Sequence, residues 1–369
     1  MTINLESFGY PVRHKKKIPF LPQIIIPHDI IQTNIEIFQM EAELDRFILS
    51  KKDYLELVSD AFTSNIHIST KLEGNPLTKA DVKRITKGTI TKGMVDSGLD
   101  FPAQEIINHI FAYMSPFFQP PWTMKHILGI HSLLMEGNSD LKPGEIRKTR
   151  AVIQSSTGEE LFIPAPPEFI VEELESLLDW LNNYGPGLYP VITGAILFHE
   201  FESIHPFEDG NGRSGRSLFH IYLQMSGLPN SKLSFIEQNI VKDSEFYYDL
   251  LAKTDFTNDY TYLITHFVKS VHNSYSEAVE RYREKDLLSS NLDETTKRIL
   301  IKAKQHRDWF NLEFSRQWFD QISDYVLRRR LNELVDLGAL IDKGSTRAKK
   351  YRFADPLNEI TKRQIDQSY

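Results

Sequence analysis

Apolar residues recur at three- and four-residue steps along most of the chain, which is the period of an amphipathic helix. The run QTNIEIFQMEAELDRFIL at 32–49 forms one apolar stripe, and the run at 53–74 forms another that ends at Gly74-Asn75-Pro76, a typical helix stop. The same period predicts helices over residues 78–90, 102–114, 123–137, 167–184, 189–204, 214–227, 244–254 and 259–284. The pattern therefore predicts a mainly α fold up to residue 285.

The stretch RKTRAVIQSSTGEELFIPAPP at 147–167 departs from this helical period. Residues of high β propensity lie on either side of Ser155-Ser156-Thr157-Gly158, which is the pattern of a hairpin inserted into a helical protein. Because an isolated hairpin adds little to a core, it serves either as a surface decoration or as a flap that docks a peptide. The residues alone favour decoration.

The polar segment at 283–295 predicts a linker. Beyond it, helical patterns at 296–306, 311–321 and 323–341 come before a turn, a strand, a basic loop and a second strand. This order predicts a small α/β winged helix-turn-helix domain at 290–369, appended to the helical part of the chain.

The composition is that of a soluble globular protein, with 41% apolar and 25% charged residues. The net charge of −7 disfavours nucleic acid as a partner of the whole chain, although a local basic patch could still bind it. The chain has no cysteine, which excludes disulfides, thiol catalysis and thiolate metal sites. Because no apolar run is long enough for a signal peptide or a membrane span, we expect a cytoplasmic protein without a membrane partner.

The candidate chemistry is concentrated in residues 205–216, HPFEDGNGRSGR. Residues 210–215 fit G-x-G-x-x-G, the fingerprint of dinucleotide-binding loops. That fingerprint follows a strand and comes before an acidic residue about twenty positions later. Here the preceding run has a helical pattern, the nearest downstream acid is late, and no alternation of strands and helices surrounds the glycines. The dinucleotide interpretation is therefore disfavoured.

A glycine-rich bend that opens onto a helix N-terminus is an anion site, because it presents unpaired N–H groups and the positive end of the helix dipole. Gly210 and Gly212 let the backbone approach a phosphate closely. Asn211 can donate to a phosphate oxygen or cap the helix. Arg213 and Arg216, three residues apart, share a helix face and can both bind phosphate oxygens.

Two further side chains complete this constellation. Asp209 is a hard oxygen ligand of the kind that magnesium on a polyphosphate requires. His205 has a side chain that can take a proton from an attacking hydroxyl near neutral pH. A base, a metal ligand, an anion cradle and two cations are the components of phosphoryl or nucleotidyl transfer, whereas a plain turn between helices needs neither the histidine nor the arginines.

The stretch matches the signature H-P-F-x-[DE]-G-N-G-R-x-x-R at every specified position, and the chain thus resembles the Fic family over most of residues 30–285. The resemblance implies a Fic-type helical bundle that transfers AMP from ATP to a Thr, Ser or Tyr hydroxyl of a target protein, which could be the chain itself. It also implies a homodimer. With this resemblance, the hairpin at 150–163 becomes a docking flap on which the target backbone adds as a strand.

The resemblance implies a role for each residue of the signature. His205 is the general base and Asp209 holds magnesium. The nest Gly210–Gly212 cradles the phosphates, and Arg213 and Arg216 bind the β- and γ-phosphates of ATP.

Tyr247 and Tyr248 lie where the family often has a pair of tyrosines near the adenine. Simple helix packing is the other explanation for this pair, and we favour it for at least one of the two. The next polar position of the family falls on Asp255, where an asparagine is expected, so its role is left open.

The segment STKLEGN at 69–75 fits [ST]-x-x-x-E-[GN] through Ser69, Glu73 and Gly74 and resembles the Fic inhibitory helix. On its own the pattern is common and could be one exposed helix turn. Glu73 would pair with Arg216 and displace the phosphates of ATP from in-line attack. The same glutamate could act as a base in the reverse reaction, which removes AMP from the target.

The segment KGSTRAKKYR at 343–352 holds five basic residues and no acidic one, and with VLRRRLNEL it could form a recognition helix and wing for DNA. This supports an alternative function, a DNA-binding regulator with a vestigial or nucleotide-sensing Fic domain. Three observations argue against this alternative. Leu327, Leu331 and Leu334 mark a packed helix face, so the arginines can be its solvated surface. Winged helices also dock proteins, and the signature at 205–216 is intact.

The expected domains are residues 1–100 with the inhibitory motif, a catalytic core at 101–285 and the winged helix at 290–369.

Overall fold

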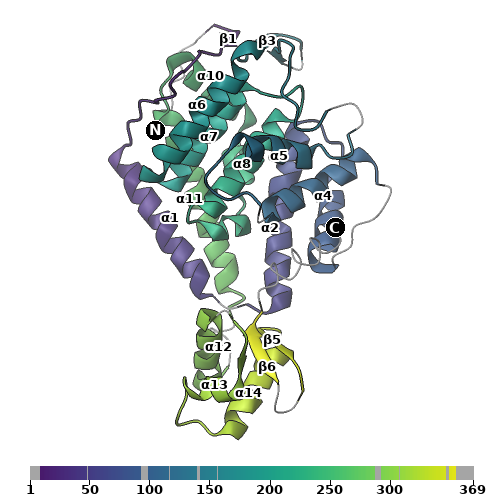
Figure 1. The fold of residues 1–369 in the computed structure, drawn as a ribbon, viewed down its shortest axis with the longest axis vertical. Coiled ribbons are helices and arrows are strands. Elements are labelled where there is room, and N and C mark those ends of the chain that lie inside the picture. Colours follow the sequence, from purple (N-terminus) through teal and green to yellow (C-terminus); the bar gives the residue numbers. More distant parts are fainter. Residues whose placement is uncertain are drawn as a thin grey trace. The chain divides into compact units, whose positions relative to one another are not determined.

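The computed structural model describes residues 9–47, 49–92, 99–115, 117–138, 142–155, 157–286, 292–306, 308–345 and 349–354. Helices predominate in these ranges and lie where the apolar period predicts them, so the prediction of a mainly α fold is confirmed (Figure 1). The chain divides into two compact units, one of residues 1–42 and 60–277 and one of residues 43–59 and 278–369. Helices α1 (His28–Arg46), α2 (Lys51–Leu72) and α11 (Thr261–Arg283) contribute residues to both units. The predicted domain boundaries remain predictions.

The first unit is a bundle around two buried helices, α7 (Pro190–Ile204) and α8 (Asn211–Met225). Its other helices are α3 (Lys79–Lys87), α4 (Phe101–Met114), α5 (Met124–Leu134), α6 (Ile170–Asn183), α9 (Ile236–Ile240) and α10 (Ser244–Thr257). A π-helical turn, Gly88–Lys92, continues α3. The rings of Phe198 on α7 and Phe219 on α8 both pack against Phe267 of α11. The turn between α7 and α8 is thereby fixed to the core.

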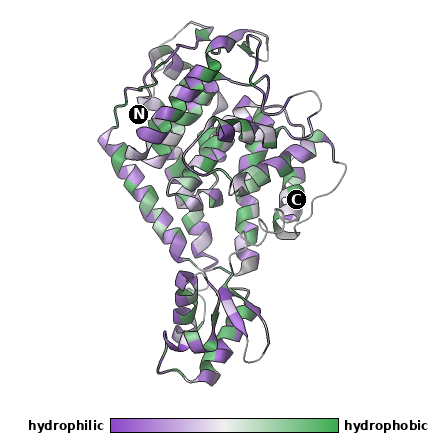
Figure 2. Cartoon of the chain, in the orientation of Figure 1, coloured by the Kyte–Doolittle hydropathy of each residue, from purple (hydrophilic) through white to green (hydrophobic). Residues whose placement is uncertain are grey.

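Local sequence features mark where these helices begin and end. Gly74 follows α2 with φ of +89°, a left-handed conformation that ends a helix and favours glycine. Thr78 and Asp81 form a reciprocal capping box at the start of α3. Asp100 caps α4, with Pro102 in the first turn. Figure 2 shows polar and apolar residues interleaved along α1 and α2, as their amphipathic period predicts.

A three-stranded sheet contains the predicted hairpin and one strand that the sequence did not reveal. The hairpin consists of β2 (Ile153–Gln154) and β3 (Glu160–Ile163), which pair antiparallel, and Ser156 of its turn lies outside the described residues. The added strand is β1 (Val12–Arg13), which pairs parallel with β3 and gives the order β1-β3-β2. Two residues are too few to show a strand period, so periodicity could not have predicted β1.

The second unit has helices α12 (Glu294–His306), α13 (Leu312–Arg316) and α14 (Asp324–Asp336), and strands β4 (Phe310–Asn311), β5 (Leu340–Lys343) and β6 (Lys350–Phe353). The strands form an antiparallel sheet of order β4-β6-β5. Its apolar core includes Leu327, Leu331 and Leu334 of α14, the packed face that the sequence predicts. Parts of the predicted linker (287–291) and of the basic loop (346–348) lie outside the described residues.

None of the helices in the described ranges is both long and apolar enough to cross a lipid bilayer.

Candidate active site

The candidate site lies at the turn from α7 to α8. α7 ends at Ile204, and His205 follows with φ of +53°, a left-handed conformation that is uncommon for a residue other than glycine. Gly210 has φ of +77° and stands before the first helical residue, Asn211. α8 therefore begins three residues before its predicted start, and residues 211–213 provide the N–H groups of its first turn.

The turn is closed by the side chain of Asn211. Its Oδ1 accepts a hydrogen bond from the N–H of Phe207 at 2.9 Å, and its Nδ2 donates to the carbonyl of Phe207 at 2.8 Å. Asn211 is almost completely buried. The side-chain amide of Asn211 thus stabilises the turn, and the backbone N–H of this residue is left to bind an anion.

Arg147 ties the turn to the base of the hairpin. Its Nε donates to the carbonyl of His205 at 2.6 Å, and its Nη2 donates to the carbonyls of Ala165 and Ile204 at 2.5 and 3.2 Å. Its Nη1 donates to the carbonyl of Thr149 at 2.7 Å. Burial lowers the pKa of this guanidinium, although nearby Glu208 opposes the change.

His131 of α5 supports the other side of the turn. Its ring stacks on Phe207, with centroids 3.7 Å apart. Its Nδ1 accepts from the N–H of Gly144 at 2.8 Å, so its Nε2 carries the proton and donates to the carbonyl of Asp209 at 3.0 Å. Burial lowers the pKa of His131 to about 4, which keeps this hydrogen-bond pattern intact near neutral pH.

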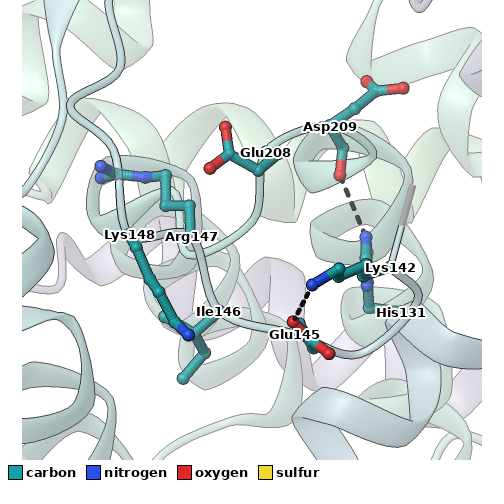
Figure 3. A pocket seen from close by; sticks show the side chains of 8 residues that line it. All are labelled: His131, Lys142, Glu145, Ile146, Arg147, Lys148, Glu208 and Asp209. Atoms are coloured by element: carbon teal, nitrogen blue, oxygen red, sulfur yellow. Dashed lines mark hydrogen bonds and ion pairs between the residues drawn. The ribbon is translucent and has the colours of Figure 1, made fainter. Parts of the chain in front are cut away.

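A hollow of about 470 Å³ lies beside this support (Figure 3). It is lined by His131, Lys142, Glu145, Ile146, Arg147, Lys148, Glu208 and Asp209. The charges are mixed, and Lys142 lies 3.6 Å from Glu145. The hollow adjoins Asp209 but does not include His205 or the first turn of α8.

The surroundings of His205 favour a neutral imidazole. Burial and, to a lesser extent, the positive charge of Arg147 lower its pKa to about 4, while Glu73 acts in the opposite direction. A neutral histidine can accept a proton. A bound polyanion would raise this pKa toward neutrality because it favours the charged form.

Arg213 is held by two carboxylates. It is buried and forms an ion pair with Glu105 of α4, and its Nη2 lies 2.8 Å from Asp209 Oδ1. Glu105 also accepts a hydrogen bond from Asn75 Nδ2 at 2.6 Å. The end of the predicted inhibitory motif is therefore connected to an arginine of the signature through Glu105.

Arg216 meets the predicted inhibitory motif directly. Its Nη2 lies 2.7 Å from Glu73 Oε1, and its Nε donates to Ser69 Oγ at 2.8 Å. Burial opposes the positive charge of Arg216, but the surrounding acidic groups, with Glu73 the strongest of them, together raise the pKa of the guanidinium. A Cβ placed on Gly212 would lie 2.1 Å from Glu73 Oε1. The carboxylate of Glu73 therefore rests on the first turn of α8, where the sequence predicts phosphates.

The two predicted adenine-contacting tyrosines differ in exposure. Tyr247 is buried against Phe198, whereas the side chain of Tyr248 is 47% exposed. The buried position of Tyr247 is compatible with simple helix packing, and the adenine contact of both tyrosines stays a prediction. Asp255 is buried and accepts a hydrogen bond from Ser203 Oγ at 2.6 Å.

Asp209 is the residue of the turn that could hold substrate-bound magnesium. Its side chain is 51% exposed, and its Oδ1 accepts from the N–H of Gly210 at 2.6 Å. Among the described residues no group of three or more His, Asp or Glu side chains could hold a metal by itself. Magnesium often binds through one or two carboxylates together with substrate phosphates and water, so a single aspartate beside an anion cradle fits this cation.

The sequence did not reveal Glu105, His131 or Arg147. Each of these residues lies at least 58 positions along the sequence from the signature residue to which it is hydrogen-bonded. Glu105 and His131 lie in amphipathic helical runs, where an isolated polar residue has no distinguishing pattern. Their partners become evident only when the helices are packed.

Comparison with known proteins gives consistent matches. Residues 121–223 match the model of the Fic/DOC family. The chain is 25% identical over 187 residues to "Protein adenylyltransferase fic-1" of Caenorhabditis briggsae, which covers 47% of this chain and 34% of that protein. It is 24% identical over 210 residues to "Protein adenylyltransferase Fic" of Nematostella vectensis, which covers 54% of this chain and 44% of that protein. The matches thus span less than half of the length of these relatives.

A solved structure extends the likeness to most of the fold. The crystal structure of a Fic family protein from Desulfovibrio desulfuricans G20 aligns with a TM-score of 0.60 at 22% identity, over 91% of this chain and 99% of that one. The resemblance to the Fic family that residues 205–216 indicate is confirmed by these comparisons.

Proposed function

We propose that the chain, whose residues 121–223 match the Fic/DOC family model, is a protein adenylyltransferase that transfers AMP from ATP to a Thr, Ser or Tyr hydroxyl of a target protein. The observation that carries the proposal is the turn at 205–216. It joins a neutral histidine, an exposed aspartate and two buried arginines at the N-terminus of one helix. The names of the curated relatives support the same reaction.

His205 is the general base of the proposed reaction. It takes the proton of the target hydroxyl, whose oxygen attacks the α-phosphorus of ATP. The new bond joins this oxygen to the α-phosphorus, and the bond from the α-phosphorus to the bridging oxygen breaks. Pyrophosphate leaves with the electrons of that bond, and AMP remains on the target.

The first turn of α8 holds the triphosphate. The N–H groups of residues 211–213 and the positive end of the helix dipole face the phosphates, and Arg213 and Arg216 offset their negative charge. Asp209 would hold magnesium. Bound there with ATP, the cation would reduce the negative charge that repels an attacking oxygen.

Glu73 inhibits transfer at this site. An anion already lies on the first turn of α8 and pairs with Arg216, the cation proposed for the γ-phosphate. ATP must displace this carboxylate or bind with its phosphates shifted, and a shift of about 1 Å can cost about a hundredfold in rate. Because Glu73 lies against the first turn of α8, we propose that it also serves as the base in removal of AMP.

Transfer of label from ATP tests the proposal. The Glu73→Gly chain is incubated with magnesium and with ATP labelled at the α- or the γ-phosphate. We expect protein-bound label from α-labelled ATP only, and loss of that label in the Glu73→Gly/His205→Ala chain, whose Kd for ATP changes less than about twofold. Label from γ-labelled ATP would identify a phosphoryl transferase instead, and equal labelling with and without His205 would exclude it as the base.

A second candidate function concerns the C-terminal residues, which are net positive although the chain as a whole is net negative. Residues 290–369 contain 16 Lys and Arg against 12 Asp and Glu, which gives them a net charge of +4. The whole chain has a net charge of −7, so residues 1–289 have a net charge of −11. From the order of α12, α13, α14 and the β5–β6 hairpin we infer a winged helix-turn-helix. We propose that this unit binds duplex DNA through α14.

The exposed side of α14 carries the residues for this contact. Tyr325, Arg328 and Arg329 lie in its first two turns and line a hollow of about 640 Å³, and the first turns of a recognition helix contact base edges. Arg329 has no ion pair in the described part of the chain, whereas Arg330 pairs with Asp293 and Glu333. Lys349, at the base of the basic loop, donates to Asn332 of α14 at 2.9 Å.

Binding of the full chain to a labelled duplex, measured by fluorescence anisotropy at two salt concentrations, tests this second function. We expect a Kd on the order of 1 μM at low salt that weakens steeply as salt rises, because phosphate contacts release counterions. Arg329→Glu should weaken binding at least about tenfold. The exposed Lys302→Glu makes the same change of charge on α12 and should weaken it far less. Absence of binding at low salt, or equal effects of the two variants, would leave this unit as a protein-docking module.

A further inference from the structure

The first described residues of the chain form a strap, residues 10–20, that links the hairpin to the helix before His205. β1 of the strap pairs with β3, and the N–H of His14 donates to the carbonyl of Ile163 at 2.9 Å. Val12 is buried. One edge of the hairpin strand β3 is therefore occupied by the chain's own backbone, and the other by β2.

His14 anchors this strap between two helices. Its Nε2 lies 2.6 Å from Glu173 Oε2 on α6, and its Nδ1 lies 2.8 Å from Ser203 Oγ on α7. The side chains of His14 and Glu173 are 1% and 2% exposed. A contact this deeply buried between segments 159 and 189 residues apart fixes the position of the strap.

Both ring nitrogens of His14 have a polar partner. Nδ1 faces Ser203 Oγ, which is also hydrogen-bonded to Asp255 Oδ1 at 2.6 Å. Nε2 faces a carboxylate oxygen of Glu173. His14 thus contacts both helices through one side chain, and an alanine at this position can make neither contact.

Lys17 forms a second anchor on the same helix. Its Nζ lies 2.6 Å from Glu200 Oε1 and 3.0 Å from Tyr260 Oη. Burial would raise the pKa of Glu200, but the charges of Lys17 and His199 outweigh it and hold the pKa at about 2. Glu200 and Ser203 both lie in the last turns of α7, which ends one residue before His205.

Through these contacts the strap connects the hairpin to the end of α7. The strap is bonded to β3 through its backbone and to the end of α7 through His14 and Lys17. We propose that His14 is a positioning residue that fixes the hairpin relative to His205, and that the strap directs an extended acceptor segment to the outer edge of β2. This inference rests on the proposed function of the hairpin and of His205, and it adds a control of acceptor binding that the signature does not contain.

Hydrogen–deuterium exchange of the full chain tests the connection without any substrate. His14→Ala should speed exchange at residues 150–163 by about tenfold while residues 211–225 remain unchanged. The matched control is Arg13→Ala, the neighbouring residue of β1, which is exposed and should alter exchange at 150–163 less than about twofold. Equal exchange at 150–163 in the two variants would overturn the proposal.

A milder variant covers the case in which His14→Ala loosens the whole unit. Glu173→Gln keeps the side chain's shape but removes the charge that His14 meets, and it should also loosen residues 150–163 selectively. If both variants speed exchange at 211–225 as much as at 150–163, His14 is only a core residue and the proposal is wrong.

Steady-state kinetics distinguish a positioning role of His14 from a catalytic one. In the Glu73→Gly background, the His205→Ala chain serves as acceptor of label from α-labelled ATP. Adding His14→Ala to the enzyme should raise KM for this acceptor about tenfold and leave KM for ATP within about twofold. If the Glu73→Gly chain labels nothing, the proposed function fails, whereas the exchange experiment still decides the role of the strap. A raised KM for ATP with an unchanged KM for acceptor would contradict the proposal.

Discussion

At the scale of single residues, the proposed inhibition depends on one ion pair. Glu73 and Arg216 lie 143 positions apart in the sequence, and their side chains meet at 2.7 Å over Gly212. The sequence could predict this pair because both partners belong to recognisable motifs. It could not predict that Asn211 closes the turn with both polar atoms of its side chain, since an asparagine beside two glycines has several equivalent uses.

Removal of this carboxylate should release the site. We expect Glu73→Gly to raise AMP transfer about a hundredfold, because the triphosphate can then bind undisplaced on α8. Lys71→Gly, in the last turn of α2 and two residues before Glu73, also introduces a glycine and should change the rate less than about threefold. Initial rates of label incorporation from α-labelled ATP measure both, and equal rates would show that Glu73 does not inhibit transfer.

At the scale of elements, the site depends on segments that are joined by buried polar side chains. Arg147 satisfies the carbonyls of Thr149, Ala165, Ile204 and His205, so the hairpin base and the end of α7 share one guanidinium. Helices with several turns were predictable from their apolar period. The two-residue strand β1 and the arginine's partners were not, because their pairing is set by packing between segments distant in the sequence.

Arg147→Met should therefore destabilise the first unit. The change leaves four carbonyls without this donor in a buried setting, and we expect the free energy of unfolding to fall by about 3 kcal/mol. Arg150→Met changes an exposed arginine nearby and should cost less than about 0.5 kcal/mol. Urea unfolding followed by circular dichroism measures both values, and a similar cost for the two variants would contradict the assigned role.

At the scale of the whole molecule, buried titratable groups link stability to pH. Burial lowers the pKa of His109, His131 and His205 to about 4 in each case, whereas a histidine in an unfolded chain titrates near 6.5. As pH falls from 7 to 5, the unfolded chain binds these protons and the folded chain does not, so stability decreases. Glu202, Asp255 and His199 act in the opposite direction, because their pKa values are raised, that of Glu202 to about 8. The pKa values of His67, His126 and His266 are lowered as well and add to the decrease.

Calorimetry should thus give a lower Tm at pH 5 than at pH 7. The His205→Gln chain lacks one of the histidines with a lowered pKa and should show a smaller decrease than the wild-type chain. A Tm that is constant or higher at pH 5 would mean that these histidines are not held neutral by the fold.

The proposed function requires that α8 and its two arginines hold a triphosphate in the space that Glu73 occupies. A crystal structure of the Glu73→Gly chain with magnesium and a non-hydrolysable ATP analogue is the decisive experiment. We predict phosphates against the N–H groups of residues 211–213 and the guanidinium of Arg216, with the α-phosphate next to His205 and magnesium on Asp209. A nucleotide bound elsewhere, or phosphates that make no contact with Arg216, would contradict the account.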